Sequence, residues 1–485
     1  MAEGLTTAGD FVLDLAEIIT VDGSPVKVTA NVLSVILFED IENPFISGSI
    51  SFNDGLNIQN LLPLIGQEVL KLRLRTPSFE TEEMIIDSLF YINNLSTVLD
   101  VNTNNKILNF EFISIEAMEN SRKSVSRTLR GTCASIVETL LRNDLKCSKD
   151  FFVDPTKDGR IILGTDVSPM KIIRDMTNEA ISERHGSPTY MFFETLEGFH
   201  FRSLESLYKE KILMEYTSDG TGGHTPRKHG FSEVILELNK IRKVQKTNSN
   251  DSMADQNNGS YASTVITHDI FNKTYKETNY NYFESFKDER HINFFNGRGK
   301  QEPMIAKVAL DDNGSTISDL PVKTFLLPVS FADIVSKQDG QYTNAITNDY
   351  KNIRGYDPDS FITKRTSMLN NYDAIAADIE VDGNTFIRAG NMVELNLPAQ
   401  SAERMEEPDK VDRFYRGAFL IRNIKHSFTL SENENKHVMS LSCVSDCVDK
   451  EILGSEIDIV PKVYGKSKKI NPLTINVNRL SDTNY

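Results

Sequence analysis

The same succession of three strands is predicted at two places far apart in this chain. In each place a short strand follows a glycine, a long strand comes after a spacer, and a polar loop leads to a third strand. The first copy comprises residues 66–74, 84–98 and 106–116, and the second comprises residues 390–397, 415–430 and 437–444. If one subunit carries two versions of one β module, a closed ring of such subunits presents twice as many modules as subunits. The pattern therefore indicates symmetric assembly rather than catalysis.

Side-chain alternation supports the strands of the first copy. In residues 70–75 leucine alternates with lysine or arginine, which places the apolar side chains on one face of a strand. In residues 107–115, Leu108, Phe110 and Phe112 share one face in the same way. Sheets built from such strands expose edges, and long edges favour pairing with neighbouring chains.

Composition sets the broad class of the protein. The 485 residues allow two to four domains, and 39% hydrophobic with 25% charged residues is normal for a folded protein. Residues 1–10 lack the basic and apolar segments of a secretory signal, so none is expected. The formal net charge of −16 argues against a surface that grips nucleic acid. An acidic wall would let a polyanion slide past, although plain solubility explains the same charge.

A small α/β domain is predicted after the first β region. Thr132 is expected to cap one helix, and Ser168 followed by Pro169 is expected to begin another. A strand over residues 160–163 and a β segment over residues 190–201 complete the domain. Its aromatic residues are expected to lie in the core.

Several further elements are predicted in the second half of the chain. They are a loop over 219–230, a long strand over 232–246, a flexible polar loop over 247–260, an aromatic-rich segment over 261–295, a helix over 359–372 and a strand over 375–381. The aromatic-rich segment fits either an interface or ordinary local core. Residues 451–485 are expected to form an extended arm that docks elsewhere.

No combination of residues predicts a catalytic, cofactor-binding or metal-binding site. Neither a nucleophile elbow nor a P-loop, zinc-protease or dinucleotide motif occurs. The ionisable candidates fall in predicted loops or on a predicted strand; they are Glu82, Glu83, Glu406, Glu407, His224, His229 and His426. Acid–base catalysis needs carboxylates in a shared cleft, and adjacency in a loop does not provide one.

The four cysteines are predicted to be reduced and structural. Cys443 and Cys447 have a spacing that could suit a metal, but no second Cys/His pair follows them. Cys133 lies on a predicted helix and Cys147 just beyond it. Reduced cysteines favour assembly in a reducing cytoplasm.

Three stretches of the chain carry a resemblance to a known family. Residues 368–373, 390–395 and 414–421 follow one another as helix, strand and long strand, and His426-Ser427-Phe428 precede a hairpin loop. Residues 269–275 have the spacing D-x-x-x-K-x-Y. In these features the chain resembles the baseplate hub protein of contractile-tailed bacteriophages of the large T-even type. That family is related to the hub part of type VI secretion spike proteins.

The resemblance implies an α+β, β-rich multidomain fold with two tail-tube-type, β-barrel-like domains and an inserted small α/β domain. The expected boundaries are 1–118 for the first tube-like domain, 119–215 for the α/β domain, 216–300 for a strand, flexible loop and aromatic-rich connection, 301–450 for the second tube-like domain and 451–485 for the arm.

The resemblance also implies a function and partners. Such hubs are non-enzymatic homotrimers whose six modules form a ring of pseudo-six-fold symmetry between the tail tube and the central spike. The implied partners are the central spike protein, the tail-tube or tube-initiator protein, baseplate wedge proteins and the tape-measure protein. DNA would pass through the lumen without specific binding, and no cofactor or stable membrane insertion is expected. The expected location is the virion tail baseplate, assembled in the host cytoplasm.

Two alternatives stay open from the sequence. One is the hub of a secretion-type injection spike, which a following OB-fold and β-helical spike would favour. The other is a tail-associated cell-wall hydrolase, which would need a catalytic carboxylate or a zinc cleft.

Overall fold

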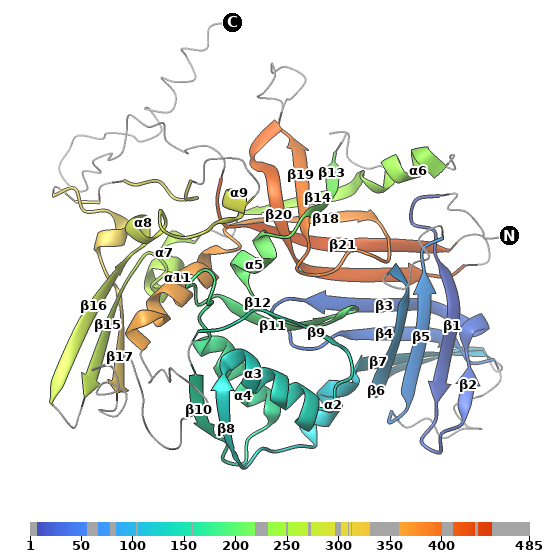
Figure 1. Ribbon diagram of the computed structural model, residues 1–485. Coiled ribbons are helices and arrows are strands. Elements are labelled where there is room, and N and C mark those ends of the chain that lie inside the picture. The colour runs from blue at the N-terminus through green and yellow to red at the C-terminus, as the bar shows by residue number, and fades with distance from the viewer. Residues whose placement is uncertain are drawn as a thin grey trace, which may run out of the picture. The chain divides into compact units, whose positions relative to one another are not determined.

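The computed structural model describes residues 7–55, 66–77, 84–102, 105–157, 159–218, 231–248, 251–269, 273–295, 302–308, 310–311, 313–329, 358–399, 411–431 and 435–448 (Figure 1). The chain divides into two compact units. The first comprises Met1–Thr247 and Ala376–Ser445, and the second comprises Asn248–Ile375 and Asp446–Tyr485. Within the described helices, none combines the length and apolar character that crossing a membrane requires.

The first module of the first unit is an antiparallel sheet with the order β3-β4-β7-β6-β5-β1-β2. Its elements are β1 (Val12–Ile19), β2 (Pro25–Lys27), the 3-10 turn η1 (Thr29–Asn31), β3 (Val32–Asp40), β4 (Ser47–Asn53), β5 (Val69–Arg75), β6 (Ile86–Asn102) and β7 (Asn105–Ser114). The alternation predicted for the first copy is confirmed, because Leu108, Phe110 and Phe112 are all buried. They belong to one apolar cluster that fills this module.

The second module continues the same sheet with the order β14-β18-β21-β20-β19-β13. Its elements are β13 (Ile212–Thr217), α6 (Phe231–Leu238), β14 (Ile241–Asn248), β18 (Ile375–Asp382), β19 (Met392–Pro398), β20 (Val411–Thr429) and β21 (Lys436–Ser445). The three strands predicted for each copy are thus confirmed as β5–β7 and β19–β21. Figure 1 shows β20 and β21 running alongside β3 and β4.

The segment between β7 and β13 has helices and short strands around its own apolar cluster. Its elements are α2 (Ile115–Ser121), β8 (Thr128–Thr132), α3 (Cys133–Thr139), the π-helical turn η3 (Leu140–Asp144), β9 (Asp150–Val153), β10 (Gly159–Leu163), α4 (Pro169–Glu179), β11 (Tyr190–Thr195), β12 (Gly198–Ser203) and α5 (Leu204–Tyr208). Thr132 caps α3 as predicted, because its hydroxyl accepts the Ser135 amide at 3.2 Å. Ser168 and Pro169 begin α4, also as predicted.

The second unit has a three-stranded sheet with the order β16-β15-β17. Its elements are α7 (Ser252–Asn258), β15 (Ala262–Asp269), β16 (Thr274–Asn281), α8 (Tyr282–Ser285), α9 (Ile292–Phe295), the 3-10 turns η4 (Ile317–Asp319) and η5 (Pro358–Ser360), β17 (Lys323–Val329) and α11 (Ile362–Asn371). The helix predicted over 359–372 is confirmed as α11.

Two predicted elements were wrong. The single strand expected over 232–246 is helix α6 followed by strand β14, because Val234 and Leu238 bury one helical face. The loop expected over 247–260 contains helix α7, which the Asp251 carboxylate caps by accepting amides from Met253 and Ala254.

The structure also divides the chain differently from the expected boundaries. β13 and β14 belong to the sheet of the second module, and residues 248–375 form most of a separate unit between β14 and β18. The predicted loop 219–230 and arm 451–485 lie outside the described residues.

Candidate functional surface

The two modules share a topology, strand for strand. Read across the sheet, β3-β4-β7-β6-β5-β1 corresponds to β14-β18-β21-β20-β19-β13, and each set also runs in the same order along the chain. The pairing of the first strand differs, since β1 is antiparallel to β5 whereas β13 is parallel to β19. The duplication extends to six positions in each module rather than the three strands expected from the sequence.

Matching local geometry fixes which residues correspond. The Ile92 amide donates to the Glu68 carbonyl at 2.8 Å, and the Ile421 amide donates to the Asn391 carbonyl at 2.9 Å. The strand pairing shifts directly after each isoleucine, at Ile92/Asn94 and at Ile421/Asn423. Both long strands therefore carry a β-bulge at the same place.

A residue signal for this correspondence is present in the sequence and was missed. Residues 90–95 and 419–424 both read Phe-x-Ile-x-Asn followed by an aliphatic residue. A comparison of the two long strands alone, centred on the bulge, would have found it. A glycine with positive φ precedes the short strand in each module, Gly66 at 85° and Gly390 at 87°.

The seam between the modules is a pair of neighbouring strands. β20 pairs with β19 through Leu420 and then with β3 through residues 423–429, where Asn423 lies opposite Asp40 and Thr429 opposite Ser34. The backbone carbonyl of the bulge residue Arg422 accepts a hydrogen bond from the Ile41 amide at 3.0 Å. One long strand thus belongs to its own module and also binds the edge strand of the other.

Glu39 fixes the seam from its buried side. Its carboxylate accepts the Ala389 amide of the second module at 2.9 Å and the Leu196 amide of the α/β segment at 2.9 Å. Burial raises the pKa of Glu39, while the Arg388 guanidinium and these two amides oppose the rise. A carboxyl group buried with these donors holds the seam together and is not accessible as an acid.

Phe428 packs between the cores of the two modules. It lies on β20 but is fully buried in the apolar cluster of the first module, with its ring 5.0 Å from that of Phe11. On its other side it stacks on His437 at 3.9 Å. The ring nitrogens of His437 and His426 are 3.1 Å apart. Burial lowers the pKa of His426 to about 3 and that of His437 well below its ordinary value, so both rings are neutral.

A second buried cluster joins the first module to the α/β segment. Lys149 Nζ lies 2.5 Å from Glu194 Oε1 and 2.6 Å from Glu116 Oε2. Glu194 also accepts the Ile46 amide at 3.1 Å and the Ser114 hydroxyl at 3.0 Å. Burial raises the pKa of Glu194 to about 7, although Lys149 opposes the rise. Lys149 in turn lowers the pKa of Glu116 against the effect of burial.

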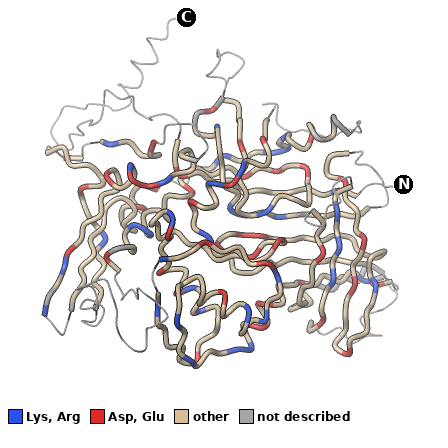
Figure 2. The backbone as a smooth tube through the Cα atoms, viewed as in Figure 1, with Lys and Arg blue, Asp and Glu red and all other residues tan. Residues whose placement is uncertain are grey.

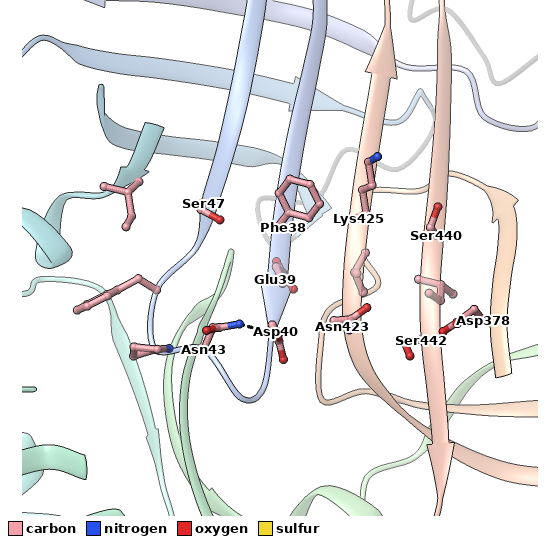
Figure 3. Close-up of a pocket in the computed structure, with 15 residues that line it drawn as sticks. Phe38, Glu39, Asp40, Asn43, Ser47, Asp378, Asn423, Lys425, Ser440 and Ser442 are labelled. Carbon is pink, nitrogen blue, oxygen red and sulfur yellow. Dashed lines mark hydrogen bonds between the residues drawn. The ribbon is translucent and has the colours of Figure 1, made fainter. Parts of the chain in front are cut away.

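The seam is hollowed on the open face of the sheet. A cavity of about 710 Å³ is lined by strands β18, β21, β20, β3, β4 and β7 and by the turn after β3. Figure 3 shows Phe38 and Lys425 on the adjacent strands β3 and β20, with Asp40, Asn423 and Ser442 further along the face. The Asn43 side chain donates to the Asp40 carboxylate at 2.7 Å.

The open face around this cavity is polar and weakly acidic. β4 contributes Ser47, Ser49 and Ser51 and no charged residue. Across β18, β21, the second half of β20, β3, β4 and β7, the exposed or half-buried charged residues of this face are Asp40, Glu111, Asp378, Glu380, Arg422, Lys425 and Lys436, with the Arg422 guanidinium 3.3 Å from the Ser442 hydroxyl. Four acidic and three basic residues give a net charge of −1. Figure 2 shows charges of both signs dispersed along the chain rather than gathered in one basic stripe.

Of the ionisable candidates, His426 lies within the described residues. His426 is a buried neutral strand residue, while Glu82, Glu83, His224, His229, Glu406 and Glu407 lie outside the described residues. Within the described part of the chain, no three His, Cys, Asp or Glu residues gather as a metal site. The four cysteines, predicted to be reduced and structural, are all buried and form no disulfide in this structure.

Comparison with known proteins gives matches in structure but not in sequence. No family model and no curated protein matches the chain. Similar solved structures include the 43 kDa tail protein of prophage MuSo2 from Shewanella oneidensis, with 6% identity over 90% of this chain and 100% of that chain and a TM-score of 0.47. The tail protein of Neisseria meningitidis MC58 matches with 7% identity over 90% and 97% of the two chains and a TM-score of 0.47.

A third similar structure belongs to a secretion system. The Escherichia coli c3393 protein, a component of the type VI secretion system described as similar to the T4 bacteriophage tail proteins gp27 and gp5, matches with 9% identity. The match covers 90% of this chain and 77% of that chain, with a TM-score of 0.38.

Proposed function

We propose that this chain is a structural, non-enzymatic hub of a contractile injection device, of the phage baseplate type. The observation that carries the proposal is the duplicated module, in which six strands recur in the same order and one module extends the sheet of the other. A catalytic domain has no need of this duplication, whereas a subunit of a ring gains rotational pseudo-symmetry from it. Three such subunits present six modules.

In this role the hub forms a homotrimeric ring of two tail-tube-type, β-barrel-like domains per subunit. The ring joins a six-fold tail tube, or its initiator protein, to a three-fold central spike, and baseplate wedge proteins and the tape-measure protein are further partners. Its place is the virion baseplate, after assembly in the host cytoplasm. DNA passes through the bore, and the polar open face with its net charge of −1 suits a wall that does not hold a polyanion.

Light scattering of the purified chain tests the ring. The expected mass is near three times 54.7 kDa. A chain that stays monomeric at high concentration would contradict the proposal. In a structure of the ring, the open face of β3, β4 and β20 is expected to line the bore, and a strongly basic bore would also contradict it.

Zymography on purified peptidoglycan tests the absence of enzymatic activity. No clearing is expected from the purified chain, with a known lysozyme in a neighbouring lane as the positive control. Clearing by this chain would replace the structural role with that of a tail-associated hydrolase.

A further inference from the structure

The long strand β20 has two successive partners along one edge. For the corresponding edge of β6, the described structure contains the first partner but no second one. The β20 edge is occupied first by β19 and then, from Asn423 onward, by β3. The β6 edge is occupied by β5 up to Tyr91, and the Ile92 amide binds the Glu68 carbonyl. Beyond Ile92, no strand in the described ranges pairs with this edge of β6.

The duplicated topology identifies the strand that fits this free edge. In the seam, the strand that binds β20 is β3, the outermost strand of the first module. The strand in the corresponding place of the second module is β14, which ends the path of the sheet. Among described strands, β14 pairs with β18 alone, so no strand of the described part of the chain occupies its outer edge.

From this correspondence we infer that β14 of one copy of the chain pairs, antiparallel, with β6 of the next copy beyond Ile92. The inference rests on the proposed ring and supplies its interface. The β6 segment starts at Asn94, the counterpart of Asn423, and the bulge carbonyl of Asn93 takes the place that Arg422 has in the seam. Each subunit then offers a β6 edge at one side and a β14 edge at the other.

Charge complementarity supports this occupant. Strand β14 contains Arg242, Lys243 and Lys246 and no acidic residue. Residues 94–102 of β6 contain one aspartate and no basic residue, and Glu111 lies beside Asn94, whose side-chain amide donates to it at 3.2 Å. Arg242 and Lys246 already form ion pairs within the chain, with Asp382 and Asp412, whereas Lys243 is exposed. Because β14 carries no acidic residue, β14-to-β6 contacts are favoured over contacts between two β14 strands.

The interface is heterologous, because two different edges meet. A head-to-tail contact closes into a ring when its rotation divides the circle. Junctions between modules would then alternate: β3 on β20 within a chain, and β14 on β6 between chains. The same strand geometry would serve both, which gives the ring its pseudo-symmetry.

Cysteine cross-linking between two differently tagged copies tests the pairing. One copy carries Asn94→Cys, and the other carries a single cysteine at one of five positions from Lys243 to Thr247, which covers both faces of β14 and more than one register. Strand neighbours lie within disulfide reach. The native cysteines are buried and will not compete. Mild oxidation of the mixed assembly is expected to give a covalent two-chain species with at least one β14 position.

Matched controls make the outcome decisive. The pair Ile36→Cys with Ser427→Cys, opposed in the seam, should form a disulfide within one chain whether or not the chain assembles. Each interface variant alone should give no two-chain species, since like edges do not meet. The chain could assemble while cross-links form only between two copies of the same variant, or not at all. That outcome would overturn the proposed strand pairing but not the ring. A persistent monomer overturns both proposals.

Discussion

The two modules have one topology and two kinds of core. The first module is filled by an apolar cluster that includes Phe52, Phe110 and Phe112. The second buries an arginine and two histidines, since Arg388, His426 and His437 are at most 2% exposed. The ionisable groups buried in the first module are carboxyl groups instead, those of Glu39, Asp54 and Glu68. Shared strand order therefore does not require a shared core. What the modules have in common is a left-handed glycine before the short strand and a bulge in the long strand, and these local features set the path of the sheet.

The largest effect on stability is expected from a substitution that disrupts the cores of both modules. Phe428→Ala should lower the free energy of unfolding by about 3–5 kcal/mol, because it leaves a cavity in the first core and removes the His437 stack of the second. Denaturant unfolding followed by circular dichroism measures this. The matched control is Phe38→Ala, on the open face of the neighbouring strand and 43% exposed, with an expected cost under about 1 kcal/mol. Equal costs would mean that the open face, rather than the shared core, holds the seam.

A smaller effect on stability is expected at the contact between the first module and the α/β segment. Because the pKa of Glu194 is raised from 4.5 to about 7, its contribution to stability is complete below about pH 4.5 and is lost as the pH rises through 7. This loss is worth about 3 kcal/mol by pH 8. Glu194→Gln should remove that decline from the pH dependence of unfolding. Glu138→Gln, on the exposed side of α3, should keep it; an unchanged decline in Glu194→Gln would refute the assignment.

Acid should lower the stability of the second module, whereas it favours the buried Glu194 carboxyl group of the previous prediction. The depressed pKa of His426 means that its contribution is complete above about pH 6.5 and is lost as the pH falls toward about 3. Between pH 6.5 and 5 the loss is about 2 kcal/mol for this residue. Hydrogen exchange, corrected for the intrinsic rate, should show β20 and β21 opening more readily at pH 5 while β6 and β7 do not. His437→Gln should reduce this acid sensitivity. Equal acid sensitivity in both modules would remove the contrast between their cores.

The smallest effect tests the shared glycine. Gly66→Ala should cost about 1–2 kcal/mol, because φ is +85° and a Cβ there finds open space with its nearest contact at 3.8 Å. Gly390→Ala should cost more, since its Cβ would lie 3.1 Å from the Phe193 ring in addition to the strain of φ +87°. Thermal unfolding of the two variants checks the order. Gly23→Ala, also at positive φ with nothing nearby, isolates the backbone cost.

Sequence reasoning recovered what local physics determines. The strands β5–β7 and β19–β21 follow from alternation and turn residues, and the cap at Thr132 follows from its hydroxyl. Helix α6 was missed because its run of Val, Ile and Leu fits a strand as well as a helix. Helix α7 was missed although Asp251 before it and Gly259 after it are cap signals.

The seam could not be predicted, because it depends on contacts between residues far apart in the chain. Nothing near Asp40 in the sequence indicates that Asn423 lies opposite it. β13 and β14 were assigned elsewhere for the same reason, since their partners β19 and β18 come more than a hundred residues later. The residue correspondence between the two modules could have been detected in the sequence, because residues 90–95 and 419–424 share a pattern that side-chain period alone does not reveal.

The connection between β14 and β18 has a consequence for how such proteins diversify. In the first module the corresponding strands β3 and β4 are joined by a turn of residues 41–46. In the second module the same step accommodates residues 249–374, with a sheet and helices of their own. The module therefore has an insertion point at which a tight turn and an entire folded unit are interchangeable.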